Sequence, residues 1–366
     1  MIVLLRARLR RRSGAPRTIH WADNGAATYP LLSGPISILE LAAKEEWSGK
    51  EAQAGGDHRQ CQSATRERWL ADRQADLLPV PYFHVVFTVP SEVAEIAFHN
   101  KAVVYAILFD AVATTFKTIA AGSRHLGGEI GFLAILHTWV QALTHHPHIH
   151  CLVPGGALSS DRRWLSCRPN FFLPINVLSR MFRRVILEGL QKAYAAGRVR
   201  FSGKVVGFEH ANAFAAAIGK LRRKNWIVYA KPPFGSPEHV LAYLGRHTHR
   251  VAIANSRLVS ADETSVTFRW RDYRHVNAPR LMSLDPHEFI RRFLIHSLPD
   301  CFHRIRHYGF LANGCRRARL ASIRQLLMLT APTATQVDET TKQLPHFDPT
   351  QCPCCGGILR ITATLP

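Results

Sequence analysis

The chain has 366 residues, of which 47 are Lys or Arg and 26 are Asp or Glu, so its formal net charge is +21. A hydrophobic fraction of 47% is that of a globular protein and excludes disorder driven by charge, and the length allows two or three domains. A charge surplus of this size favours a polyanionic partner, with nucleic acid as the first candidate and an anionic membrane as the second.

The sequence itself offers neither a membrane span nor a secretory signal. No stretch approaches the roughly 18 uninterrupted apolar residues of a span. The opening, MIVLLRARLRRRSG, has its apolar residues before its basic ones, the reverse of a signal peptide. The eight Cys are too scattered for a disulfide framework. We therefore expect a soluble, intracellular protein.

The first half of the chain alternates strand and helix patterns. After an aperiodic stretch at 1–57, a helix is expected from Arg66 to Pro79. The β-branched and aromatic run FHVVFTVP at 83–90 predicts a strand, and 101–121 predicts a long apolar helix. Further strands are expected at 131–139 and 146–156, the second ended by Pro-Gly-Gly.

The second half is more basic. A basic amphipathic helix is expected over about 175–197, and the tract 219–233 runs from a helix end into a strand. Another helix opens with Ser236 as its N-cap and proline in its first turn. A hairpin is expected over 250–273, and the rest, up to about 330, is expected to be helical.

The densest chemical motif is HHPHIH, from His145 to His150. Because side chains alternate along a strand, His148 and His150 project to one face while Ile149 points into the core. Two imidazoles on one rigid face can bind a divalent metal, and His137 on the preceding strand could add a third. The alternative is that these histidines are ordinary core or surface residues.

The nucleophile of such a site would come from elsewhere in the chain. HExxH, a P-loop and nearby paired carboxylates are all missing from the sequence, which leaves metal-assisted phosphoryl transfer with a separate nucleophile. Tyr243 is the candidate, because YLGRHTHR surrounds it with Arg246, His247, His249 and Arg250. A free Tyr has a pKa of about 10, so it needs cations or a metal-held phosphate to attack. The alternative is a packing role on an amphipathic helix.

Four motifs in fixed order carry a resemblance to a known family: PYFHVVFTVP, HHPHIHCLVPGG, YLGRHTHRVAIAN and RIRHYGFLANGCRR. They resemble the rolling-circle transposases of insertion-sequence family 91, which belong to the HUH endonuclease superfamily, over about 61–327. The resemblance implies an α+β fold, with a ferredoxin-like HUH nuclease core that has an antiparallel sheet, and a helical basic C-terminal region. The implied domains are a degenerate or truncated zinc-binding region at 1–65, the catalytic domain at 66–275, a basic helical DNA-binding region at 276–330 and a linker with a Cys-cluster tail at 331–366.

The resemblance also implies a chemistry. His148 and His150 would hold Mg²⁺ or Mn²⁺, and Tyr243 would attack the scissile phosphate, form a 5′-phosphotyrosine link and free a 3′-hydroxyl. The partner would be single-stranded DNA at the transposon ends and at the target, and no membrane would be involved. The protein would act in the bacterial cytoplasm, at the nucleoid. The candidates for the third metal ligand are His137, Gln141 and His247. The candidates for the residue that handles the leaving-group proton are His145 and His146.

This sequence departs from the family pattern at two places. The second Tyr of the family, four residues after the first, is His247 here, and the N-terminal zinc module survives only as HRQCQ at 58–62. Near the C-terminus, three thiols form half or more of a candidate Zn²⁺ site, with His346 as a fourth ligand candidate; they are Cys352, Cys354 and Cys355.

Basic tracts provide the expected DNA contacts. One tract precedes Trp226 and Tyr229, a combination of charge and aromatic rings typical of single-strand binding. The candidate residues are Arg222, Arg223, Lys224, Arg246, Arg250, Arg304, Arg306, Arg316 and Arg317. The alternative is a solvated helix face. For the whole chain, the alternative to an active nuclease is a decayed transposase remnant that only binds DNA, and an RNA-binding basic protein is disfavoured by the His pair.

Overall fold

The computed structural model describes residues 73–231, 233–234, 239–240, 243, 252–253, 257–272 and 278–327. Several predictions fall outside these residues: the region 1–65, the N-cap Ser236, the candidates Arg246, His247 and Arg250, and the cysteines Cys352, Cys354 and Cys355.

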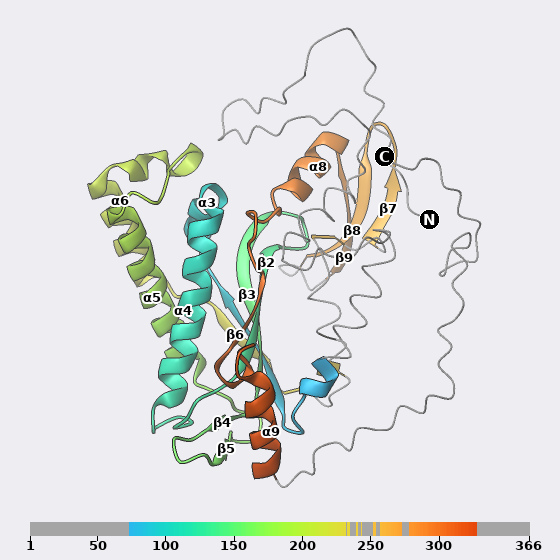
Figure 1. Cartoon of the computed structure of the whole chain (residues 1–366). Helices are drawn as coiled ribbons and strands as arrows, with labels where there is room; N and C mark the ends of the chain where they lie inside the picture. The colour runs from blue at the N-terminus through green and yellow to red at the C-terminus, as the bar shows by residue number, and fades with distance from the viewer. Residues whose placement is uncertain are drawn as a thin grey trace, which may run out of the picture.

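A five-stranded sheet with the order β10-β2-β3-β1-β6 forms the centre of the fold (Figure 1), and every neighbouring pair is antiparallel. Its strands are β1 (Tyr82–Thr88), β2 (Phe132–Trp139), β3 (His145–Pro154), β6 (Val228–Lys231) and β10 (Ile305–Tyr308). Since β3 lies between β1 and β2, and β1 lies between β3 and β6, two split βαβ units interlock as in ferredoxin-like folds. The predicted α+β fold with an antiparallel sheet is confirmed.

Helices cover one face of this sheet, the left-hand side in Figure 1. The helices α3 (Ser91–His99) and α4 (Lys101–Ala121) connect β1 to β2, whereas α5 (Ile175–Ala195) and α6 (Ala211–Arg223) lie between β3 and β6. Alternate strand residues fill the space between the two layers. Phe87 of β1, for example, packs on Phe116 of α4 with ring centroids 5.0 Å apart.

The helix α4 is also long and apolar enough to span a membrane, but more than half of that stretch is buried inside the protein. Its buried side chains, among them Tyr105, Leu108 and Phe116, belong to the main core beneath the sheet. We therefore interpret α4 as the core helix of the fold.

A second sheet packs against the turn of the β2–β3 hairpin. It consists of β7 (Leu258–Ala261), β8 (Val266–Asp272) and β9 (Ala278–Leu284), followed by α8 (Pro286–Leu294), and lies at the upper right in Figure 1. Phe268 and Phe289 share a core cluster with Leu143 of the turn. The Arg257 guanidinium also donates a hydrogen bond to the carbonyl oxygen of Gln141. The hairpin that carries HHPHIH is thus anchored at its far end.

Short elements complete the described chain. They are β4 (Gly156–Leu158), β5 (Trp164–Ser166), the 3-10 helices η1 (Gly203–Glu209) and η3 (Gly309–Leu311), and α9 (Arg316–Leu326). Because β9 and β10 are strands, the prediction that everything after the hairpin is helical was wrong at these two places. In β10 the four-residue run IRHY is too short and too basic to stand out, and Arg306 is accommodated by lying over the Phe109 ring, 4.2 Å from its centroid.

Gly309 ends β10 at a position that accepts no side chain. Its φ is +59°, and a Cβ atom there would lie 1.7 Å from the carbonyl oxygen of Ile130. We expect Gly309→Ala to lower the free energy of unfolding by roughly 3 kcal/mol or more, because main chain must move at the edge of the central sheet. Gly314→Ala is the control, since a Cβ atom there meets nothing within 4 Å. Urea unfolding should separate the two variants, and equal midpoints would contradict this account.

Two buried histidines on the helix side make the fold sensitive to acid. His145 Nε2 lies 2.9 Å from Tyr105 Oη, and His296 Nε2 lies 3.2 Å from the Leu143 carbonyl oxygen. Burial lowers the pKa of His145 to about 3 and that of His296 to about 4.

Below about pH 6.5 the unfolded chain therefore takes up protons that the folded chain cannot. Stability should be fully present above about pH 6.5 and should fall as the pH drops toward 4. The loss between pH 7 and pH 5 should be about 1–2 kcal/mol for each of the two histidines. Denaturant unfolding at both pH values checks this, and a His296→Gln variant should show a shallower dependence on pH.

Candidate active site

The sheet face opposite the helices carries a group of histidines. The strand register sets His137 of β2 opposite His148 of β3, and Val86 of β1 opposite His150 of β3, so these side chains share one face. Ile149, between the two histidines of β3, is fully buried in the core on the other face. The alternation expected from the sequence is present in the structure.

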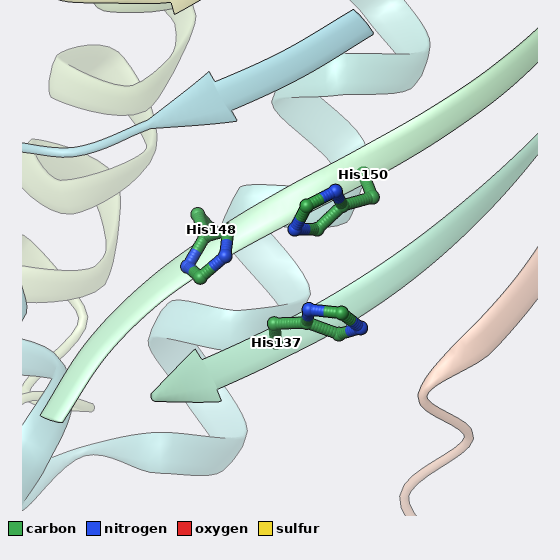
Figure 2. Close-up of side chains that lie close together, drawn as sticks. All are labelled: His137, His148 and His150. Carbon is green, nitrogen blue, oxygen red and sulfur yellow. The ribbon is translucent and has the colours of Figure 1, made fainter. Parts of the chain in front are cut away.

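Three of these histidines form a cluster that fits a metal ion (Figure 2). Each of His137, His148 and His150 places a ring nitrogen within 4.8 Å of the others. The cluster contains no carboxylate from the described residues. Three imidazoles suit Mn²⁺ or another transition metal better than Mg²⁺, which prefers oxygen ligands.

A hydrogen bond orients one of the rings, and a stacking contact orients another. His148 Nδ1 lies 2.8 Å from the carbonyl oxygen of His146, so Nδ1 carries the hydrogen and Nε2 has the lone pair that can coordinate. His137 is buried and stacks on Trp139 with ring centroids 4.7 Å apart. The cluster is therefore held by contacts within its own two strands, as metal ligands commonly are.

Tyr243 lies directly against the cluster. Its Oη atom is 3.0 Å from His150 Nδ1 and 2.8 Å from His84 Nε2. The side chain is buried and belongs to a small apolar cluster with Tyr82 and Leu152. Burial raises the pKa of the Tyr243 phenol well above its ordinary value of 10, with a smaller contribution from the buried Cys151 thiol. The phenol is therefore neutral in this state, and it needs added positive charge before it can act as a nucleophile.

His84 belongs to the site, although the sequence did not mark it as a candidate. It lies on β1, is only 4% exposed, and its Nε2 is 2.9 Å from His150 Nδ1. The two imidazole rings stack with centroids 5.1 Å apart and only 6° between their planes. The available signal was the one ionisable residue in the run FHVVFTVP, which predicts a special environment for His84 but does not predict its neighbours.

The remaining histidine and glutamine candidates differ in whether they lie on the sheet face that carries the histidine cluster. His145 points to the helix side, toward Tyr105, so of the two residues considered for the leaving-group proton only His146 lies on the face of the cluster. Its ring centroid is 5.7 Å from that of His148. Gln141 lies in the turn beyond β2, and His137 is the third-ligand candidate that the structure places in the cluster.

The first group of predicted DNA contacts lies on the helix side of the sheet. Arg222, Arg223 and Lys224 are exposed at the C-terminal end of α6, where Lys224 forms an ion pair with Glu92. Trp226 is buried, and its Nε1 donates to the Leu221 carbonyl oxygen at 3.1 Å, so it cannot stack on a base.

Tyr229, by contrast, is 51% exposed and pairs with Val86 of β1, whose side chain shares the face of the histidine cluster. Of the two aromatic residues in this tract, Tyr229 is therefore the one available for stacking on a base.

The second group divides into exposed and packed arginines. Arg317 is exposed, whereas Arg316 forms an ion pair with Asp76 at 3.2 Å and Arg306 packs on Phe109 and Phe302. Arg304 is half-buried at the start of β10.

We expect Arg317→Ala to reduce the salt dependence of single-strand binding by about 0.7 in log–log slope. Arg306→Ala should instead lower thermal stability with little change in that slope. Fluorescence anisotropy at several salt concentrations, alongside thermal unfolding, distinguishes the two roles.

Comparison with known proteins identifies the class. Residues 131–319 match the family described as "Putative transposase", and residues 58–89 match the family described as "Transposase zinc-binding domain". The chain is 50% identical to "Putative transposase y4qJ" of Sinorhizobium fredii over 309 residues, which are 82% of this chain and 78% of that relative. It is 24% identical over 309 residues to "Transposase for insertion sequence element IS801" of Pseudomonas savastanoi pv. phaseolicola, covering 83% of this chain and 73% of that relative.

An α+β protein with this histidine cluster and these relatives is a transposase, an enzyme that acts on DNA. The chain belongs to the transposases of insertion-sequence family 91. The zinc-binding match extends from the predicted N-terminal region into β1 and contains one Cys, Cys61. A structural zinc site takes four ligands, most often Cys and His, and Cys61 is the one thiol that the matched residues offer.

Proposed function

We propose that this transposase nicks and rejoins single-stranded DNA at the ends of a mobile element by rolling-circle transposition. The observation that carries the proposal is the position of Tyr243 Oη, which is 3.0 Å from Nδ1 of His150, a member of the three-histidine cluster. A hydroxyl nucleophile beside a metal-binding group supports this proposal, because a metal ion is one of the means by which a weak nucleophile is activated for phosphoryl transfer.

In the proposed reaction His137, His148 and His150 would hold Mn²⁺ or Mg²⁺. An ion bound there would supply positive charge beside the scissile phosphate. Tyr243 loses its proton as Oη forms a bond to phosphorus, and the bond from phosphorus to the 3′-oxygen breaks. That oxygen takes up a proton and leaves as a 3′-hydroxyl. Rejoining is the reverse step, in which a 3′-hydroxyl attacks the phosphotyrosine, so the bond energy is conserved without ATP.

The test is a search for the covalent intermediate and its site. The protein is incubated with Mn²⁺ and a single-stranded oligonucleotide from its own element's ends, and a protein–DNA adduct is sought on a denaturing gel. Tryptic mass spectrometry should place the nucleotide on the peptide that contains Tyr243. An adduct on a different residue would refute the assignment of the nucleophile.

A second candidate function is DNA binding without cleavage. Two sequence observations favour it: position 247 is His where the family has a second Tyr, and the zinc-binding match contains only Cys61. If the same oligonucleotide is retained by the protein but no adduct forms with any divalent ion, this second function replaces the first.

For the tail of the chain, we propose Zn²⁺ binding by Cys352, Cys354 and Cys355, and for the protein a cytoplasmic location at the nucleoid.

A further inference from the structure

His84 forms a triangle of hydrogen-bonding contacts with Tyr243 and His150, and the reaction proposed above gives His84 no role. The three atoms are Tyr243 Oη, His84 Nε2 and His150 Nδ1. They are separated by 2.8 Å, 3.0 Å and 2.9 Å, so every pair is within hydrogen-bonding distance. His84 is 4% exposed, on a strand paired with β3 on one side and β6 on the other. The backbone of His84 is therefore held by strand pairing on both sides.

The number of hydrogens on these three side chains determines which atom donates and which atom accepts each hydrogen bond. A neutral imidazole that coordinates through Nε2 carries its hydrogen on Nδ1, so His150 in that state donates from Nδ1. The Tyr243 hydroxyl has one hydrogen of its own and can accept another bond at its oxygen. The arrangement that uses both hydrogens runs from His150 Nδ1 to Tyr243 Oη, and from Tyr243 Oη to His84 Nε2.

We infer that His84 is a positioning residue for the nucleophile: its Nε2 accepts the phenol hydrogen and holds Tyr243 Oη against His150. The inference rests on the proposed function, in which Oη is the attacking atom. An acceptor on β1 fixes the direction of the O–H bond, and so it turns the oxygen lone pairs away from His84. Displacement of a reacting atom by about 1 Å can cost about 100-fold in rate, which sets the size of the expected effect.

The alternative is that His84 only fills space, since its ring also lies 4.6 Å from the Tyr243 ring and 6.5 Å from the Phe234 ring, centroid to centroid. A packing role depends on shape, whereas a positioning role depends on an acceptor at the place of Nε2. His84→Gln retains an acceptor near that place, and His84→Leu retains bulk without the acceptor. His84→Asn has an acceptor on a shorter side chain that does not reach it.

The experiment compares these variants in adduct formation at saturating oligonucleotide, with oligonucleotide binding and Mn²⁺ binding measured separately. We expect His84→Leu and His84→Asn to slow adduct formation about 10–100-fold, while His84→Gln stays within a few-fold of the wild type. Both binding affinities should be unchanged, because His84 is outside the three-histidine cluster. If His84→Leu does not fold, the Asn and Gln pair decides.

A further measurement does not depend on activity. If His84 Nε2 accepts the Tyr243 hydroxyl, the shifts in unfolding midpoint caused by His84→Asn and by Tyr243→Phe should not add up in the double variant. Additive midpoints, or equal loss of activity in Gln and Leu variants, would overturn the inference. An adduct that survives in Tyr243→Phe would instead overturn the proposed function, so the two failures are distinguishable.

Discussion

Tyr243→Phe is expected to abolish the covalent protein–DNA adduct, a loss of at least about 1000-fold, because it removes the oxygen atom that we propose attacks phosphorus. The ring itself remains, and it should keep its place in the apolar cluster with Tyr82 and Leu152. Binding of the oligonucleotide and of Mn²⁺ should therefore persist. Quantitative gel analysis of adduct formation, with binding measured on the same preparations, checks the prediction.

Tyr82→Phe is the matched control. Tyr82 belongs to the same cluster, is similarly buried, and its hydroxyl accepts a hydrogen bond from the Leu78 backbone N–H at 2.9 Å. Loss of that buried bond should cost about 1–2 kcal/mol of stability but leave adduct formation intact. Equal activities of the two Phe variants would show that the adduct forms through another side chain.

The sequence was informative wherever the decisive physics is local. Alternation along a strand is enough to put His148 and His150 on one face and Ile149 in the core. His137 could be proposed as a partner because β2 and β3 are separated by a short turn, and the register does set it opposite His148. The long helix at 101–121 was equally clear from its apolar length, and α4 has these bounds.

Long-range pairing was beyond this reasoning. His84 meets His150 because β1 pairs with β3 across the two helices between them, and no local pattern specifies that register. β10 reaches the edge of the same sheet from more than 150 residues further along the chain, in a tract whose charge favoured a helix. Burial was likewise misjudged for Trp226, since its neighbours in sequence are basic and its neighbours in space belong to α5 and α6.

Loss of the proposed metal ligands is the second change for which we expect a large effect. His148→Ala/His150→Ala should lower Mn²⁺ affinity and slow adduct formation about 100- to 1000-fold, the size expected when several kcal/mol of charge stabilisation at the phosphate is lost. Isothermal titration with Mn²⁺ provides the readout that does not depend on activity. A double variant of two exposed histidines, His210→Ala/His287→Ala, controls for the loss of two imidazoles away from the cluster.

The two single variants separate metal binding from hydrogen bonding. His148 bonds its Nδ1 to the His146 carbonyl oxygen of its own strand, so His148→Ala removes a ligand and leaves the Tyr243 hydroxyl in place. His150 contacts Tyr243 Oη as well, so His150→Ala removes a ligand and a hydrogen-bond donor together. We therefore expect His150→Ala to be the slower of the two at equal Mn²⁺ occupancy. If both lose Mn²⁺ affinity while adduct formation is unchanged, the ion has no part in the attack on phosphate.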